Sequence, residues 1–243
     1  MQIISDRKAF KRGVLLYRKI RYRKGHGVHS PFVFNFITKV IDERAAYYCL
    51  KDIELTRKKF FYENEPFHKW EIRPKYGALL MRISNYLKPQ NLLLIGSDLS
   101  FSALYSSSYA STTRCVVLEE KTEIAAFSRS VIEKHRAKNI LLKEGVYQKT
   151  VSEVLEHTDK LDFVYFGYPN DSALDIPVFE CILPHLHEHS VLILRGIRKT
   201  KDRKEFWNRL CARPEVSVTI DVYELGIAFF NHKIHKKNYI VSF

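Results

Sequence analysis

The sequence has no long apolar run and no closely spaced cysteines, and both absences argue against whole classes of protein. No apolar stretch approaches the ~20 residues that a membrane-spanning helix needs. The 4 cysteines are far apart and form no Cys-x-x-Cys pair, which argues against zinc-knuckle and dithiol redox motifs. The basic N-terminus also lacks the apolar core of a secretion signal, so we expect a cytoplasmic protein.

The composition is that of a globular and strongly basic protein. With 243 residues, of which 46% are hydrophobic, the chain is long enough to bury one good core and carry a small appendage. The formal net charge of +13 favours an anionic partner such as nucleic acid, anionic lipid or a phosphorylated metabolite, although a solvated basic surface explains the same charge. The cations gather in residues 7–24, 195–204 and 233–237.

The hydrophobic pattern predicts an N-terminal helical extension, residues 1–75, followed by an α/β domain, residues 76–243. Ser30 as N-cap and Pro31 at the first helical position predict a helix start. From Asn91 onward, strands alternate with helices, which indicates a mostly parallel sheet with helices on both faces. The last two strands follow each other closely, with Leu225-Gly226 between them, as in an antiparallel hairpin. The expected strands are 91–95, 114–118, 139–143, 161–166, 190–194, 216–223 and 226–231, with 239–243 as a further edge strand.

Residues 91–120 are the most informative part of the sequence. They predict a buried strand, a tight turn at residues 96–100, a helix and a second strand that ends on Glu119 and Glu120. In nucleotide-binding α/β folds, an acid at that place accepts hydrogen bonds from ribose hydroxyls, and the first turn faces the ligand. Such turns are usually rich in glycine, and here only Gly96 remains.

These features resemble the class I S-adenosylmethionine (SAM) dependent methyltransferases. The chain looks closest to a Bacteroidetes-type group that opens with His-Gly-Val/Ile-His-Ser-Pro-Phe, which here spans residues 26–32. The resemblance implies a Rossmann-like, seven-stranded and mostly parallel sheet, with SAM at the carboxyl ends of the first strands. It further implies methyl transfer to an acceptor that the sequence does not identify. The remaining similar segments are residues 75–80, 86–91, 218–221 and 225–230.

The resemblance also implies which residues contact SAM. Within the first turn, Leu94 replaces the usual acid and Ser100 replaces the usual last glycine, whereas Gly96 matches. Glu119 matches the acid that binds ribose, and the segment around Val146 stands where relatives contact adenine. The expected cofactor-binding residues are Gly96, Ser97, Asp98, Ser100, Glu119, Glu120, Val146, Gly167 and Tyr168.

The catalytic side departs further from the metal-dependent relatives. Gly167 stands where they often carry the aspartate of Phe-Ile-Asp-Gly, and Arg195-Gly196 stands where they carry an Asp-Asp pair. Those acids bind a divalent metal or act as a base. Because the replacements remove hard oxygen ligands and add a positive charge, we expect no metal site.

Histidines are the remaining candidates for acid–base chemistry. We consider His26 and His29 as catalytic general bases or as pocket-lining residues, against the alternative that they only fix their loop. The alternating residues His185, His187 and His189 are interpreted as a helix end rather than a metal site.

Two functions therefore stay open. One is a metal-independent SAM-dependent methyltransferase, and the other is a catalytically inactive protein of the same fold that acts as a basic binding or scaffold module. If the sheet is as expected, Tyr165, Phe166 and Tyr168 lie near the cations of residues 195–204. Such a surface can stack bases and hold phosphates, although packed aromatics under a solvated basic face are the simpler explanation.

Overall fold

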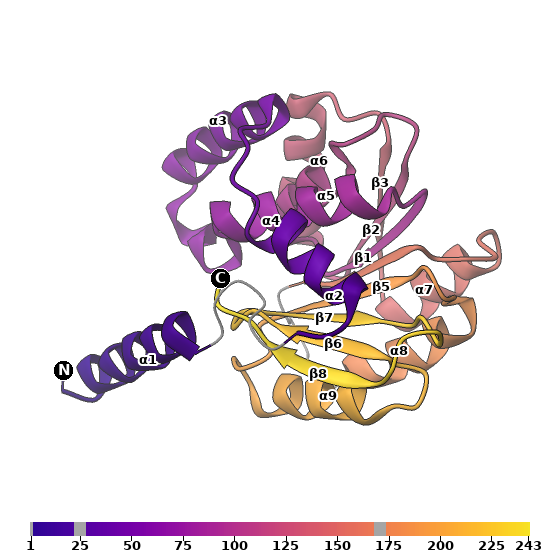
Figure 1. Cartoon of the computed structure of the whole chain (residues 1–243). Helices are drawn as coiled ribbons and strands as arrows, with labels where there is room; N and C mark the ends of the chain where they lie inside the picture. The colour runs from indigo at the N-terminus through magenta and orange to yellow at the C-terminus, as the bar shows by residue number, and fades with distance from the viewer. Residues whose placement is uncertain (1, 22–27, 168–173) are drawn as a thin grey trace.

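The computed structural model describes residues 2–21, 28–167 and 174–243, and the side chains among them from residue 12 onward. Its centre is an 8-stranded sheet in the order β3-β2-β1-β4-β5-β7-β6-β8, with helices on both faces (Figure 1). The strands are β1 (Asn91–Ile95), β2 (Arg114–Glu119), β3 (Ile140–Glu144), β4 (Phe163–Phe166), β5 (Val191–Arg195), β6 (Val218–Asp221), β7 (Leu225–Phe229) and β8 (Lys237–Ile240).

The helices precede the sheet and alternate with its strands. The α-helices are α1 (Gln2–Arg21), α2 (Pro31–Phe36), α3 (Tyr48–Glu63), α4 (Pro74–Leu87), α5 (Phe101–Ser107), α6 (Thr122–His135), α7 (Tyr147–Leu155), α8 (Asp175–Ile182) and α9 (Lys201–Ala212). A π-helical turn, Ile37–Ile41, continues α2, and short 3₁₀ turns span Glu65–Trp70, Asp98–Ser100 and Leu183–His185.

The predicted α/β class is confirmed, and the number of strands is corrected from seven to eight. The additional strand is β8, which pairs parallel to β6 at the edge of the sheet and overlaps the further edge strand expected at residues 239–243. The predicted antiparallel hairpin is present, because β7 pairs antiparallel with both β5 and β6. Gly226 was expected at its turn but lies inside β7, opposite Leu194 and Asp221.

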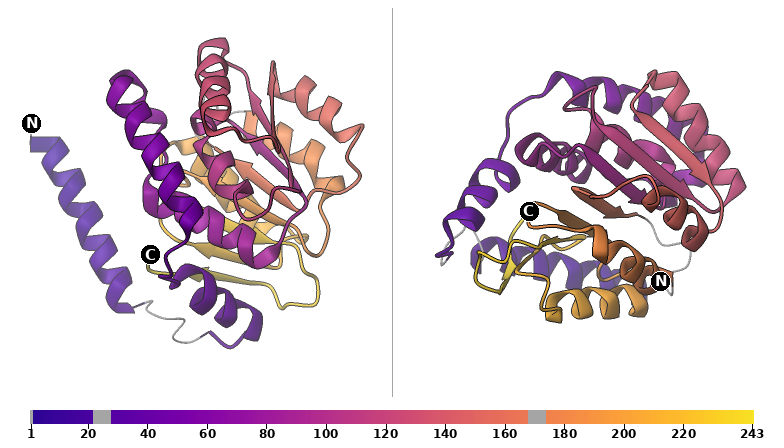
Figure 2. Two further views of the ribbon diagram at one scale, coloured as in Figure 1. Left: turned by 90° about the horizontal axis from the view of Figure 1, so that it is seen from above. Right: turned by 90° about the vertical axis from the view of Figure 1, so that its right-hand side faces the viewer.

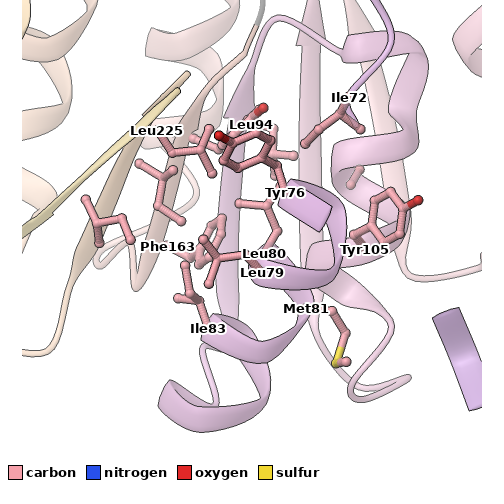
Figure 3. Packing of buried hydrophobic residues seen from close by; sticks show 14 of the residues in the cluster. Ile72, Tyr76, Leu79, Leu80, Met81, Ile83, Leu94, Tyr105, Phe163 and Leu225 are labelled. Carbon is pink, nitrogen blue, oxygen red and sulfur yellow. The ribbon is translucent and has the colours of Figure 1, made fainter. Parts of the chain in front are cut away.

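Alternation along the central strands divides the core between the two faces of the sheet. Successive side chains of a strand point to opposite faces. Leu94 and Phe163 therefore pack with Leu79, Leu80 and Ile83 of α4 on one face, as Figure 3 shows. Their sequence neighbours pack with α7, α8 and α9 on the other face, in a cluster that includes Leu93, Ile95, Val164, Phe166, Val151, Phe179 and Phe206.

The predicted start of α2 is confirmed. The Val33 N–H donates to the Ser30 hydroxyl at 3.4 Å, and Pro31 is the first helical residue. The ring of Phe32 packs edge-on against Phe229, with the ring centroids 5.1 Å apart. Farther along the chain, α4 begins at Pro74, so the expected domain boundary between residues 75 and 76 falls in its first turn.

Helix α1 is joined to the sheet by a buried ion pair near its C-terminal end. The Arg18 guanidinium donates to the two carboxylate oxygens of Asp221, at 2.9 Å and 3.0 Å, and Arg198 also donates to that carboxylate. From this attachment α1 extends away from the body of the molecule (Figures 1 and 2). None of the helices in the described ranges is long and apolar enough to cross a membrane.

Gly226 tests the packing of α9 on the sheet. A Cβ at this position would lie 2.3 Å from the Trp207 ring of α9. We expect Gly226→Ala to lower the free energy of unfolding by about 2 kcal/mol, because the overpacked ring must move. The control is Gly13→Ala, since a Cβ on Gly13 meets no atom within 4 Å. Urea denaturation that shows equal stabilities for the two variants would contradict this packing.

The acidity of Asp221 predicts a dependence of stability on pH. Burial raises the pKa of this carboxyl, but the hydrogen bonds from Arg18 and Arg198 outweigh burial and hold the pKa below its ordinary value. The stabilisation is therefore present at neutral pH and is lost as the pH falls below about 4. In urea unfolding, wild type should exceed Asp221→Asn in stability at about pH 7 and lose that advantage near pH ~3. A difference that is the same at both pH values would contradict the ion pair.

Candidate functional site

The carboxyl ends of four parallel strands meet at one edge of the sheet. Ile95, the last residue of β1, is level with Leu118 of β2 and Phe166 of β4, and Phe166 is level with Leu194 of β5. The strand order reverses between β1 and β4. In open α/β sheets, ligands bind outside the carboxyl ends of strands at such a switch point.

The loop after β1 has a backbone conformation that non-glycine residues rarely adopt. The φ angles are +46° at Asp98, +57° at Leu99 and +62° at Ser100, after +81° at Gly96. A left-handed conformation costs an L-residue about 1 kcal/mol or more. Strained backbone of this kind gathers at functional sites. The Ser100 hydroxyl is also buried without a hydrogen-bond partner in the described part of the chain.

Glu119 ties the end of β2 to this loop. One of its carboxylate oxygens accepts the Ser97 N–H at 3.1 Å and the Ser97 hydroxyl at 2.6 Å. The other accepts the N–H groups of Glu120 and Lys121, at 3.1 Å and 3.2 Å. A carboxylate has about four lone-pair sites, so these donors occupy all of them. The residue is 1% exposed, and Ser128 donates to the Ser97 hydroxyl at 2.9 Å.

Two glycines let the loops after β1 and β4 touch. The Gly96 N–H donates to Leu118 O at 3.0 Å, and the Gly167 N–H donates to Ile95 O at 2.8 Å. A Cβ at Gly167 would lie 2.3 Å from the carbonyl oxygen of Gly96. The aspartate that metal-dependent relatives carry at this position therefore does not fit while the loops are this close.

A buried ion pair joins the β1 loop to the end of β5. The Arg195 guanidinium donates to the Asp98 carboxylate, which also accepts the Tyr165 hydroxyl at 2.6 Å. Arg195 further donates to the carbonyl oxygens of Trp70, at 3.1 Å, and Glu71, at 2.6 Å. One guanidinium thus connects β5, the β1 loop and the segment before α4.

The surroundings fix the protonation of this cluster. Burial, with the negative charge of Asp98 as the next cause, raises the pKa of Tyr165 well above its ordinary value. Burial disfavours the charged form of Arg195, but Asp98 outweighs it and the pKa of Arg195 is raised. At neutral pH the tyrosine is therefore neutral and the arginine cationic.

A second buried arginine lies beside the first. Arg203 of α9 donates to Phe166 O at 3.3 Å and to Arg195 O at 3.1 Å, and its Nε lies 2.7 Å from the Asp175 carboxylate. Two guanidinium groups thus lie at the ends of β4 and β5, and cations disfavour a divalent metal there.

Four of the residues considered for a nucleic-acid face are packed aromatics and buried cations. Tyr165, Phe166, Arg195 and Arg203 are all buried, so their side chains are packed inside the domain and do not present a stacking surface.

Most of the other expected cofactor residues lie at the same edge. The Gly145 N–H donates to Glu119 O at 3.0 Å, which brings the loop after β3 to the end of β2. Val146 in that loop is 52% exposed, and Glu120 is partly exposed beside Glu119. Tyr168 and His26 lie outside the described residues.

The histidines belong to other parts of the molecule. His29 is exposed, and no described contact joins it to Glu119 or to the β1 loop, so its catalytic role stays a prediction. Phe32, in the helix that follows it, packs on Phe229, which is level with Val191 at the amino end of β5. His187 bonds Asp162 at 3.0 Å, and His185 contacts Thr158 O at 3.0 Å.

The Asp98–Arg195 pair was not predicted from the sequence, although a signal was present. Asp98 lies in the loop after β1, and Arg195 stands after β5 where the expected pattern has an acid. Because the topology brings these two places together, an acid at one and a cation at the other indicate a direct ion pair.

A double-mutant cycle measures this pair. We expect Arg195→Met to lower the free energy of unfolding by about 3–5 kcal/mol, because it leaves the buried Asp98 charge without its partner. Adding Asp98→Asn should cost less than the sum of the single changes by about 2 kcal/mol. Arg209→Met, which breaks the exposed pair with Glu205, is the control and should cost less than about 0.5 kcal/mol. If Arg195→Met costs no more than this control in urea denaturation, the pair does not hold the site together.

Comparisons with known proteins identify the fold of this chain. The sequence matches no protein-family profile and no curated protein. Among solved structures, it is similar to an O-methyltransferase from Bacillus cereus in complex with SAH, with a TM-score of 0.61 and 17% identity over 82% of this chain and 97% of that one. It is also similar to the SAH-bound methyltransferase PaMTH1 of Podospora anserina, with a TM-score of 0.63 and 15% identity over 83% of this chain and 96% of that one. For the O-methyltransferase TomG of Streptomyces achromogenes, in complex with SAM, the TM-score is 0.59 and the identity is 13% over 77% of this chain and 91% of that one. At these identities the likeness shows that the chain has the fold of these O-methyltransferases.

Proposed function

We propose that this protein binds SAM at the carboxyl edge of β1 and β2 and transfers its methyl group to an acceptor without a metal ion. The observation that carries the proposal is the β1 loop. It keeps three consecutive left-handed residues, Asp98 to Ser100, where a glycine-rich turn would face the cofactor. The Ser100 hydroxyl in the same loop is buried and has no hydrogen-bond partner among the described residues, so it supplies a polar group for a ligand. The similar O-methyltransferase structures in complex with SAH and SAM support SAM as the ligand.

The residues at this edge fit an adenosine-type ligand. Glu119 is the group to accept the ribose hydroxyls, and the partly exposed Val146 offers an apolar contact for adenine. Gly96 and Ser97 set the backbone that faces the sulfonium side of the cofactor. SAM supplies an activated methyl group when it is bound.

Methyl transfer depends more on how the protein positions donor and acceptor than on acid–base chemistry. The reaction is an in-line displacement, so holding donor and acceptor in line supplies much of the rate enhancement. Arg195 and Gly167 replace the carboxylates that would hold a metal, which supports transfer to an acceptor that needs no metal-assisted deprotonation. The Asp98–Arg195 pair would keep the loop and β5 fixed beside the reacting groups.

A second candidate is a protein of this fold that no longer binds SAM and acts as a scaffold. The observation that favours it is the Glu119 carboxylate, whose acceptor sites are all occupied by groups of the protein. SAM binding in the first proposal therefore requires at least one of these four donors, two of which belong to Ser97, to give up its hydrogen bond to Glu119.

Calorimetric titration with SAM and SAH separates the two functions. We expect binding at about micromolar Kd for the wild type, and a loss of about 100-fold for Glu119→Gln, since an amide cannot accept every donor of the carboxylate. Glu123→Gln, an exposed acid in the first turn of α6, is the matched control.

Ser97→Ala tests the site without removing the acid. It deletes one donor to Glu119 and frees an acceptor for ribose, so SAM should bind about 3–10-fold more tightly than to the wild type. No heat from SAM or SAH at about millimolar concentration, with folded wild type and folded Ser97→Ala alike, would reject SAM binding and support the scaffold.

A further inference from the structure

Helix α1 exposes large apolar side chains on its outer side. Leu16 is 60% exposed, Tyr17 59% and Ile20 76%. Leu16 and Ile20 are four residues apart and so share one face of the helix, with Tyr17 about 100° around from Leu16. The apolar side chains thus form one continuous outward arc.

The opposite side of the helix is attached to the domain. Arg18 lies about 200° around the helix from Leu16. Its guanidinium is buried, pairs with Asp221 and lies 5.3 Å from the centre of the Tyr223 ring. Because this attachment fixes the rotation of α1 about its axis, the apolar arc faces away from the sheet.

The arc is bordered by positive charge. Arg12, Lys19 and Arg21 are exposed on the same helix. In the sequence, residues 7–24 contain nine Lys and Arg and no Asp or Glu. A helix with an apolar arc beside cations has the pattern of helices that lie in the interface of a membrane.

Among the described side chains of α1, from residue 12 onward, Arg18 is buried and Val14 and Leu15 are half-buried, whereas the others are exposed. The described part of α1 extends from the body beyond the Arg18 contact (Figures 1 and 2). Helices in proteins are stabilised mainly by covering an amphipathic face, and isolated ones are marginal in water. The exposed Leu16 and Ile20 on the outward arc therefore call for a surface that covers them.

We propose that α1 binds an anionic lipid surface, with Leu16, Tyr17 and Ile20 in the headgroup–acyl boundary and the neighbouring cations on acidic headgroups. Lipid suits this arc better than nucleic acid, because phosphates satisfy the cations but leave the leucine and isoleucine exposed to water. Lipid also suits it better than a second copy of the chain, because two copies would bring two strongly basic helices together. The proposal is independent of methyl transfer.

The attachment of α1 sets how the domain meets the lipid. Asp221 ends β6 and lies opposite Gly226 of β7, and Gly226 in turn lies opposite Leu194, next to Arg195 at the end of β5. The carboxyl edge that carries the candidate site is therefore the edge to which α1 is joined. Binding through α1 holds this edge toward the membrane.

Vesicle co-sedimentation of the full chain tests the proposal. The probes are vesicles of phosphatidylcholine alone and of phosphatidylcholine with about 30% phosphatidylglycerol. We expect the wild type to sediment with the anionic vesicles and not with the neutral ones. The variant Leu16→Gln/Ile20→Gln should bind the anionic vesicles about tenfold more weakly, since two apolar side chains no longer enter the bilayer.

The matched control is Leu55→Gln, which removes a leucine of similar exposure, 58%, from α3. It should bind like the wild type, and unchanged thermal unfolding should show that all variants are folded. Equal binding by the double variant and the wild type, an equal loss in Leu55→Gln, or no anionic binding at all would overturn the proposal. So would binding to single-stranded RNA that the double variant weakens equally, or a wild-type dimer in light scattering that the double variant dissociates.

Discussion

The buried ion pair between Asp98 and Arg195 is the interaction on which the carboxyl edge of the sheet depends. It joins the loop after β1 to the end of β5, and the same guanidinium holds the carbonyls of Trp70 and Glu71. A charge buried in this way is costly without its partner, so neither residue can change alone. The pair also offsets the strain of the left-handed residues Asp98 to Ser100.

The site therefore combines features that favour the binding of a ligand with protein groups that already occupy the hydrogen-bonding positions of that ligand. The strained loop and the buried Ser100 hydroxyl, which no group in residues 28–167 or 174–243 bonds, belong to the first kind. The saturated carboxylate of Glu119 belongs to the second, since the protein supplies the donors that ribose would supply. Ser97 connects the two, because it is both a residue of the loop and the donor of two of these hydrogen bonds.

Much of the fold follows from local pattern in the sequence. Three predicted features have causes within a few residues, and the structure has each of them. They are the strands that alternate with helices, the helix start at Ser30-Pro31 and the acid at the end of β2. The logic of parallel strands also brings Gly96 and Glu119 to one edge. Side-chain partners were harder to predict, because they depend on contacts across the whole domain. Arg195 looked like a surface cation in sequence, and only the packing of the segment before α4 encloses it.

The most direct test of the account follows the N–H groups that surround Glu119. In an NMR titration with SAH, the amide signals of Ser97, Glu120 and Lys121 report on that carboxylate, because all three donate to it. We predict that these signals shift together and saturate as ribose hydroxyls replace donors of the carboxylate. If all three stay unchanged in the folded protein at saturating SAH, the carboxylate is a structural group and the edge of the sheet is not a SAM site.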